Sequence, residues 1–349
     1  MKITDVRSFV VDATATYGRP RRRHWVFVHV HTDEGITGVG EASNWPGELV
    51  VETAVRDLKR HVVGQDPFNV ESLWQRMYFG SYPYGIGGAV ISGMSGIEVA
   101  CWDIIGKALK VPVWKLLGGT CHEKIRLYGH AGSPEGAREL VDEGYTAVKT
   151  SPSPEIVRSI REAVGENVEI AVDRGGYRDQ AAIVKVARQL ERYNLLFFEV
   201  NPENINSLAQ LKAEVKVPLA TGETLYTRHG FREVFERQAA HIIQPDVVRT
   251  GGILETKKIA AIAETYYMPV APHNPNGPVA TMASVHLAAS LPNFQILEYV
   301  AEDVPWREEV ATPIEVKRGF IELPTKPGLG IELDEEEVAK HPYKELANG

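Results

Sequence analysis

The chain has 349 residues, a formal net charge of −8 at pH 7 and an apolar content of 44%. This length exceeds that of one compact sandwich or bundle, and the apolar content can bury a large core, so a barrel with a smaller companion domain is expected. The negative charge and the lack of a basic stripe argue against nucleic acid or an anionic membrane as a partner.

The N-terminal segment, residues 1–122, is expected to form an α+β module. Apolar residues alternate with polar ones over 3–11, 25–31 and 36–41, and an Asp-Glu-Gly turn joins the last two runs. This pattern predicts a three-stranded antiparallel meander. Residues 48–110 then change to helical spacing, with a glycine-rich loop at 85–88.

Residues 123–310 alternate strictly between short apolar runs and amphipathic stretches. The runs that predict strands are 125–128, 147–150, 169–172, 195–200, 218–220, 241–244, 269–271 and 294–297. Eight strands joined by helices of three to four turns predict an α/β fold, a closed parallel (TIM-like) barrel. The tail, 311–349, is polar and alternating, and we expect it to leave the barrel and return to the N-terminal module.

Location and redox state follow from two further observations. The first twenty residues contain no apolar signal-peptide core, and no run reaches the ~18 apolar residues of a membrane span, so a cytoplasmic protein is expected. Cys101 and Cys121 lack the pair spacing of a metal site and are interpreted as buried thiols in a reducing cytosol.

Six polar residues recur at intervals of about 25 residues, each at or near the end of a predicted strand. They are Asp173, Glu199, Glu223, Asp246, His273 and Glu298. The active site of such a barrel is built from the C-terminal ends of its strands, so these side chains are expected to meet at one mouth. The chain is therefore predicted to be an enzyme.

Asp173, Glu199 and Glu223 end three successive strands and form a candidate metal site. Three carboxylates without cysteine suit a hard cation, and Mg²⁺ is the first choice because it keeps water sites open for a substrate carboxylate. The alternative interpretation is that each acid caps the helix that follows it.

Three further strand-end positions suggest acid–base and electrostatic chemistry. Asp246 and His273 end neighbouring strands, so the carboxylate could hold one imidazole nitrogen and leave the other for proton transfer. Lys149 would place a positive charge in the same mouth, as a base or as an electrostatic partner, unless it is a solvated surface lysine. Glu298 is either a site residue or a helix cap or ion-pair partner.

Two basic or histidine-rich stretches lie in the N-terminal module. Arg19, Arg21, Arg22 and Arg23 could close over an acidic substrate, although such runs are usually solvated. His29 and His31 form a His-x-His pair, but strand alternation simply places both on one face, so zinc is not favoured.

Four stretches, in this order, resemble the enolase superfamily, in particular the mandelate racemase/muconate lactonizing enzyme group and its galactonate- and gluconate-type sugar-acid dehydratases. They are IEVACWDIIGKALKVPVWKLLGG at 97–119, ATGETLYTR from Ala220, IIQPDVVRTGGILETKKIAAIAE from Ile242 and APHNPNGPVA from Ala271. The resemblance covers nearly the whole chain. It implies a (β/α)₇β barrel with an α+β capping domain formed by the N-terminal segment and the tail.

The resemblance also implies roles for the residues of the mouth. Asp173, Glu199 and Glu223 match the Mg²⁺ ligands, His273 with Asp246 the acid–base dyad, Lys149 the electrostatic partner and Glu298 a polar contact on the side of an enediolate intermediate. A Mg²⁺-dependent dehydratase acting on an aldonate would then release water and form a 2-keto-3-deoxy acid. Cap loops around 17–23 and 82–88, with Tyr17, Arg21 and Tyr82, would contact the substrate, and a homo-oligomer, either a dimer or an octamer, is implied.

Three departures from the family pattern leave the reaction open. Ser151 stands where racemases carry a second lysine, which disfavours a two-base racemase. Gly175 stands where galactonate-type dehydratases carry the histidine that helps the hydroxyl to leave, and the usual Glu-Glu-Pro reads Glu199-Val200-Asn201-Pro202. Either His273 acts as both base and acid, or Arg174, Tyr177, Lys149 or a metal-bound water replaces the missing acid, or the reaction is epimerisation or has been lost.

Overall fold

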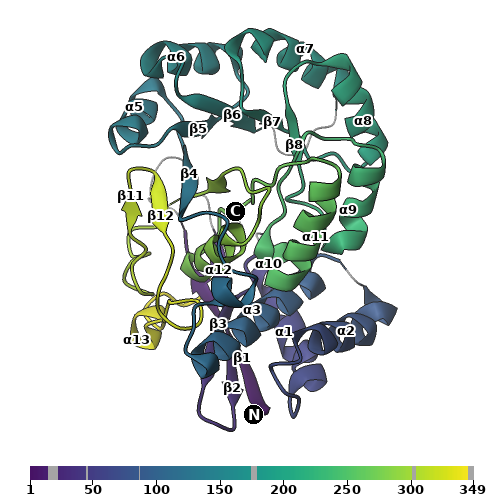
Figure 1. Ribbon diagram of the computed structural model, residues 1–349, viewed down its shortest axis with the longest axis vertical. Helices are drawn as coiled ribbons and strands as arrows, with labels where there is room; N and C mark the ends of the chain where they lie inside the picture. Colours follow the sequence, from purple (N-terminus) through teal and green to yellow (C-terminus); the bar gives the residue numbers. More distant parts are fainter. Residues whose placement is uncertain (15–22, 45, 86, 174–178, 301–303, 345–349) are drawn as a thin grey trace.

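The computed structural model describes residues 1–14, 23–44, 46–85, 87–173, 179–300 and 304–344. An N-terminal cap lies at one end of the molecule and a barrel at the other (Figure 1). In the cap, β1 (Ile3–Asp12), β2 (His24–Thr32) and β3 (Thr37–Glu41) form an antiparallel sheet in the order β1-β2-β3. The predicted meander is therefore confirmed.

The cap helices are α1 (Glu48–Val62), α2 (Val70–Ser81), α3 (Ala89–Leu109) and α4 (Val113–Leu116), with the short 3₁₀ helix η1 (Tyr82–Tyr84) after α2. Helix α3 lies so close to β3 that a Cβ atom added at Gly40 would be 2.0 Å from the carbonyl oxygen of Gly96. In the part of the chain that the structure describes, α3 alone is long and apolar enough to cross a membrane, but 83% of that stretch is buried. Its apolar surface belongs to the core of the cap.

The barrel strands run parallel, and each of the first five pairs with the strand that follows it along the chain. They are β4 (Lys124–His130), β5 (Ala147–Thr150), β6 (Glu169–Asp173), β7 (Phe197–Glu199), β8 (Leu219–Thr221), β9 (Ile242–Ile243) and β10 (Leu297–Glu298). Strand β10 pairs with β4, which closes the barrel. The predicted barrel is confirmed.

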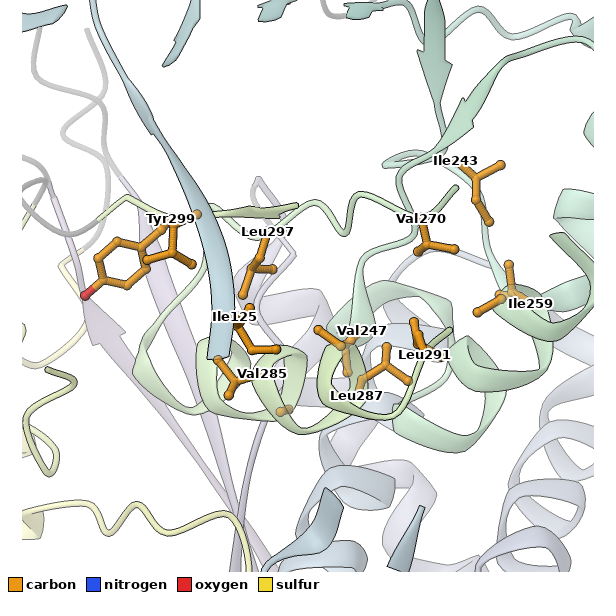
Figure 2. Close-up of a cluster of buried hydrophobic side chains, with 14 of the residues drawn as sticks. Ile125, Ile243, Val247, Ile259, Val270, Val285, Leu287, Leu291, Leu297 and Tyr299 are labelled. Carbon is orange, nitrogen blue, oxygen red and sulfur yellow. The ribbon is translucent and has the colours of Figure 1, made fainter. Parts of the chain in front are cut away.

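The helices that follow the strands form an outer ring (Figure 1). They are α5 (Pro134–Asp142), α6 (Pro154–Val164), α7 (Gln180–Leu190), η2 (Glu191–Tyr193), α8 (Ile205–Glu214), α9 (Thr227–Glu236), α10 (Val247–Thr250), α11 (Ile253–Thr265) and α12 (Pro278–Ala289). Their apolar sides pack on the outer faces of the strands. Figure 2 shows part of this core, where Ile125 and Leu297 of the neighbouring strands β4 and β10 lie near Val285 and Leu287 of α12.

The seventh strand, expected at 269–271, is reduced to single bridges from Val270 to Ile243 and Phe294. Pro269 and Pro272 flank this segment, and a proline has no backbone N–H to donate to a ladder. The predicted position of the strand is confirmed, but the strand is shorter than predicted.

The C-terminal tail connects the two parts of the molecule. Its hairpin of β11 (Val316–Lys317) and β12 (Phe320–Glu322) pairs antiparallel with the start of β4, an addition to the barrel sheet that was not predicted. The tail then reaches the cap, where Leu329 N–H donates to Asp103 (2.8 Å) and the short helix α13 (Glu335–Val338) follows. The expected return to the N-terminal module is confirmed, while the domain boundaries after residues 122 and 310 stay predictions.

Two buried glutamates of the cap hold it against the barrel. Glu41 accepts the N–H groups of Gly277 (2.7 Å) and Ala280 (2.8 Å) at the start of α12, and Glu98 accepts those of Ile253 (2.7 Å) and Leu254 (2.9 Å) at the start of α11. A carboxylate at a helix N-terminus satisfies orphan donors and meets the positive end of the helix dipole. These helices begin just beyond the C-terminal ends of the strands, so the cap packs against the mouth of the barrel.

The two cysteines lie in different environments. Cys101 is buried in α3, whereas Cys121 is exposed in the connection that precedes β4. Both are free thiols, and the prediction that both are buried was wrong for Cys121.

Candidate active site

A layer of polar side chains covers the inner core of the barrel at its C-terminal end. The inner core consists of Tyr128, Ala147, Ala171, Phe197, Ala220, Ile242, Ala271 and Ile296. Two positions further along, on the same face of each strand, stand His130, Lys149, Asp173, Glu199, Gly222, Gln244, His273 and Glu298. Alternation of side chains therefore turns an apolar layer into a polar one at the mouth, the place where barrels of this kind carry their active sites.

Lys149 is the centre of this polar layer. Its Nζ lies 2.7 Å from Glu199, 3.1 Å from Glu298 and 3.3 Å from Asp173, and its side chain is only 2% exposed. Burial alone would lower the pKa of Lys149, but Glu199 and Glu298 outweigh it and raise the pKa well above its ordinary value. The alternative of a solvated surface lysine is thereby excluded, and the raised pKa favours a charged ammonium over a base.

The three acids of the candidate metal site converge as predicted. Asp173 and Glu199 face each other across β6 and β7, and the side-chain amide of Asn201 donates to both Glu199 (3.0 Å) and Glu223 (3.0 Å). None of the three caps a helix, because the capping side chains of α7 and α8 are Asp179 and Asn204, and α9 has no side-chain cap. The helix-cap alternative was therefore wrong for these acids.

Donor groups of the protein occupy the oxygens of these acids. Lys149, Asn201 and His273 bind them, and among the described residues no group of three or more Asp, Glu, His or Cys side chains is already arranged around a metal position. The chemistry of the set nevertheless fits a hard cation, since it offers only carboxylate oxygens and stands partly open, with Asp173 34% and Glu223 19% exposed.

Asp246 and His273 form the predicted pair. Nδ1 of His273 lies 2.8 Å from Asp246, and Nε2 lies 2.8 Å from Glu223. Asp246 also accepts from the amide of Asn276 and, as the cap of α10, from the N–H of Val248. Burial would lower the pKa of His273, but Glu298 and Glu223 outweigh it and raise the pKa to about 10.

Glu298 lies in the site and caps no helix. One oxygen, Oε1, binds Lys149 and lies 2.6 Å from Nε2 of His130, while Oε2 accepts the backbone N–H of Asn274 (3.0 Å). Burial would raise the pKa of Glu298, but Lys149 and His273 hold it well below its ordinary value. Glu298 is thus both an ion-pair partner and a residue of the mouth, and it is not a helix cap.

Three polar residues of the mouth were not predicted from the sequence. His130 and Gln244, which donates to Glu199 (3.1 Å), both stand two positions after an inner-core residue, so the strand period would have found them. Asn201 follows the end of β7, and no periodic signal marks it.

The predicted substrate contacts are only partly described. Tyr17 and Arg21, together with Arg19, Arg22, Arg174, Gly175 and Tyr177, lie outside the described residues. Tyr82 lies in η1 and is 63% exposed. Arg23, the last of the basic run, does reach the barrel, where it donates to the carbonyl of Pro275, two residues after His273.

The two cap histidines have separate neighbours. Both stand on β2, where His29 lies 3.2 Å from Glu335 of the tail and His31 lies 2.9 Å from the hydroxyl of Thr37. These contacts tie β2 to its surroundings and give no support to a zinc site.

Comparisons with known proteins identify the family of this chain. Residues 6–118 match the family model for the mandelate racemase/muconate lactonizing enzyme N-terminal domain, and residues 133–338 match that for the enolase C-terminal domain-like family. A D-xylonate dehydratase from Haloferax volcanii is 34% identical, with 97% of this chain and 89% of the relative covered.

Several solved structures are also similar to this chain over nearly its whole length. A protein proposed to be a galactarate dehydratase, from Agrobacterium radiobacter, was solved with bound sodium and L-malate; it has a TM-score of 0.90 and 32% identity, with 100% of this chain and 97% of that chain covered. A mandelate racemase/muconate lactonizing enzyme-like protein from Rubrobacter xylanophilus has a TM-score of 0.90 and 33% identity, with 98% of each chain covered. The chain belongs to the mandelate racemase/muconate lactonizing enzyme group of the enolase superfamily.

Proposed function

We propose that this protein is a Mg²⁺-dependent dehydratase that converts an aldonate, a polyhydroxylated sugar acid, into a 2-keto-3-deoxy acid. The class of enzyme, a hydro-lyase acting on sugar acids, follows from the dehydratase relatives. The observation that carries the finer proposal is the pairing of His273 with Asp246 in the same mouth as three carboxylates and a buried lysine.

Asp173, Glu199 and Glu223 would hold the cation, as members of the superfamily bind Mg²⁺. When bound, Mg²⁺ would supply positive charge for the substrate carboxylate and for the negative charge that develops beside it. Asn201 supports the ligand set, because its amide fixes Glu199 and Glu223 relative to each other. The altered motif after β7 therefore retains an orienting hydrogen-bond donor for the proposed ligands.

His273 would remove the α-proton. Asp246 fixes its Nδ1, which leaves Nε2 directed to the mouth as the nitrogen that exchanges a proton with the substrate. In this structure Nε2 binds Glu223, and the surrounding carboxylates favour the charged imidazole. A neutral base at pH 7 requires that these carboxylates bind a positive group other than His273.

Lys149 and Glu298 would hold the reacting end of the substrate. The ammonium of Lys149 is fixed by three carboxylates and costs no reorganisation when negative charge develops near it during proton removal. Ser151, in place of a second lysine, leaves His273 as the principal base of the described mouth.

A screen of the purified protein with Mg²⁺ against aldonic, uronic and aldaric acids in D₂O tests the proposal. D-Xylonate and galactarate are the first acids to try, because proteins similar to this chain are named for them. Formation of a 2-keto-3-deoxy acid, lost on addition of EDTA and restored by Mg²⁺, is expected. Deuterium exchange at the α-carbon without loss of water would replace the proposal with epimerase-type chemistry, and Mg²⁺ binding without either reaction would indicate lost catalysis.

The oligomeric state is proposed from the family resemblance, and the location from the sequence. We expect a homo-oligomer, a dimer or an octamer, in the cytoplasm, without a nucleic-acid or membrane partner. Light scattering coupled to size-exclusion chromatography measures the assembly directly.

A further inference from the structure

A second histidine stands in the mouth beside Lys149. His130 is the last residue of β4, pairs in register with Lys149 of β5, and follows the inner-core residue Tyr128 by two positions. Its side chain thus extends from the same face as Tyr128, at the level where the polar layer begins. From this position we propose that His130 is the general acid that protonates the leaving hydroxyl. It would take the role that a histidine at the position of Gly175 has in galactonate-type dehydratases.

Glu298 connects the two histidines of the site. Its Oε1 lies 2.6 Å from Nε2 of His130, and its Oε2 lies 3.8 Å from Nε2 of His273. One buried carboxylate therefore faces both imidazoles, one on each oxygen. A molecule held beside Glu298 would therefore have a base, His273, on one side and a proton donor, His130, on the other.

Exposure distinguishes His130 from the other basic groups of the mouth. Its side chain is 42% exposed, compared with 6% for His273 and 2% for Lys149. A group that is open to the mouth can touch a bound molecule and regain its proton from water. Lys149 is enclosed by three carboxylates and its side chain is only 2% exposed, so its ammonium has little access to a leaving group in the mouth.

The reaction requires such a donor, because hydroxide is a poor leaving group unless it is protonated as it departs. His273 first takes the proton from C2, and the electron pair left there is held in the enediolate formed with the substrate carboxylate. That pair then forms the C2–C3 double bond as the C3–O bond breaks. The protonated imidazole of His130 gives its Nε2 proton to that oxygen, which leaves as water. The enol then gains a proton at C3 and loses its hydroxyl proton, so the net change is the loss of one water, and both histidines return to their starting states through solvent.

This inference rests on the proposed function, and a pair of variants at position 130 tests it. In His130→Gln, the amide nitrogen of glutamine stands near the position of Nε2 and can still donate to Glu298, but it cannot act as an acid. In His130→Ala, both the hydrogen bond and the acid are lost. The substrate is the acid that the wild-type enzyme dehydrates, with D-xylonate as the first probe, and the analogue is its 3-deoxy-3-fluoro derivative, since fluoride leaves without a proton.

We expect His130→Gln to lower the dehydration kcat by about 100-fold or more, the usual contribution of a general acid. The same variant should still exchange the α-proton for deuterium, because His273 is unchanged, and should release fluoride from the analogue at close to the wild-type rate. Mg²⁺ titration and circular dichroism of both variants control for the integrity of the site.

Two outcomes would overturn the assignment. Dehydration by His130→Gln at close to the wild-type rate would make His130 a positioning residue for Glu298. Loss of exchange and fluoride release together with dehydration would show that His130 supports the whole site and is not its acid. Failure of the wild-type enzyme itself to dehydrate any acid is a different result, which removes the proposed function and this inference with it.

Discussion

His286 joins three parts of the molecule and predicts how stability depends on pH. From α12, its Nδ1 accepts the backbone N–H of Trp114 in α4 (3.0 Å), and its Nε2 contacts the carbonyl of Leu329 in the tail (3.0 Å). Because Nδ1 accepts, the neutral ring with its proton on Nε2 is the form that satisfies both contacts. Burial lowers the pKa of His286 from 6.5 to about 4.

The sign of the effect follows from proton binding in the two states. Between about pH 6.5 and pH 4 the unfolded chain holds a proton on this histidine and the folded protein does not, so acidification favours unfolding. The contribution of His286 is complete above about pH 6.5 and is lost as the pH falls toward 4. Integrated from pH 7.5 to pH 4.5, the loss is about 2.5 kcal/mol.

Comparison with His286→Asn isolates this contribution. Asparagine keeps an acceptor near Nδ1, does not titrate and leaves the Leu329 carbonyl unpaired, so the wild type should be more stable by about 1 to 3 kcal/mol at pH 7.5. Urea unfolding of both proteins from pH 7.5 to pH 4.5 cancels the other titrating groups. We expect the difference to shrink by about 2.5 kcal/mol over this range, and a difference independent of pH would refute the reasoning.

Further variants test the site and the attachment of the cap. His273→Asn should abolish turnover while preserving Mg²⁺ affinity, whereas Glu223→Gln should weaken Mg²⁺ binding first; isothermal titration beside the activity assay separates the two, and full activity of His273→Asn would contradict the dyad. Glu98→Ala leaves the N–H groups of Ile253, Leu254 and Trp102 without their acceptor and should lower the free energy of unfolding by about 3 kcal/mol or more, measured by denaturation beside the exposed control Glu162→Ala. Gly40→Ala places a methyl group 2.0 Å from the carbonyl oxygen of Gly96 and should cost about 3 kcal/mol, while Gly136→Ala, whose Cβ would meet its nearest atom at 3.9 Å, should lower the melting temperature little or not at all.

The part of the fold that repeats could be predicted from the sequence. Barrel strands are buried on both faces and read as short apolar runs, and their C-terminal ends share one face of the barrel, so a strand-end acid such as Asp173 or Glu199 needs no long-range information to be placed. The same logic, applied strictly at a period of two, also reaches His130 and Gln244. The resemblance to the enolase superfamily then supplied roles for residues that spacing alone could only bring together.

Pairing between distant segments was decided by the tertiary structure alone. Residues 320–322 of the tail pair with residues 124–126 of β4. Glu98 of the cap accepts the N–H of Ile253 at the start of α11, 155 residues later in the chain. Such contacts depend on which strand edges and which N–H groups at helix N-termini remain unpaired after the local elements have formed. A local sequence pattern does not specify the distant segment that will pair with them. The three hydrogen bonds of the Glu298 carboxylate are of the same kind. The charge of Glu298 could be predicted from the sequence, but the contact of His130 with one of its oxygens could not.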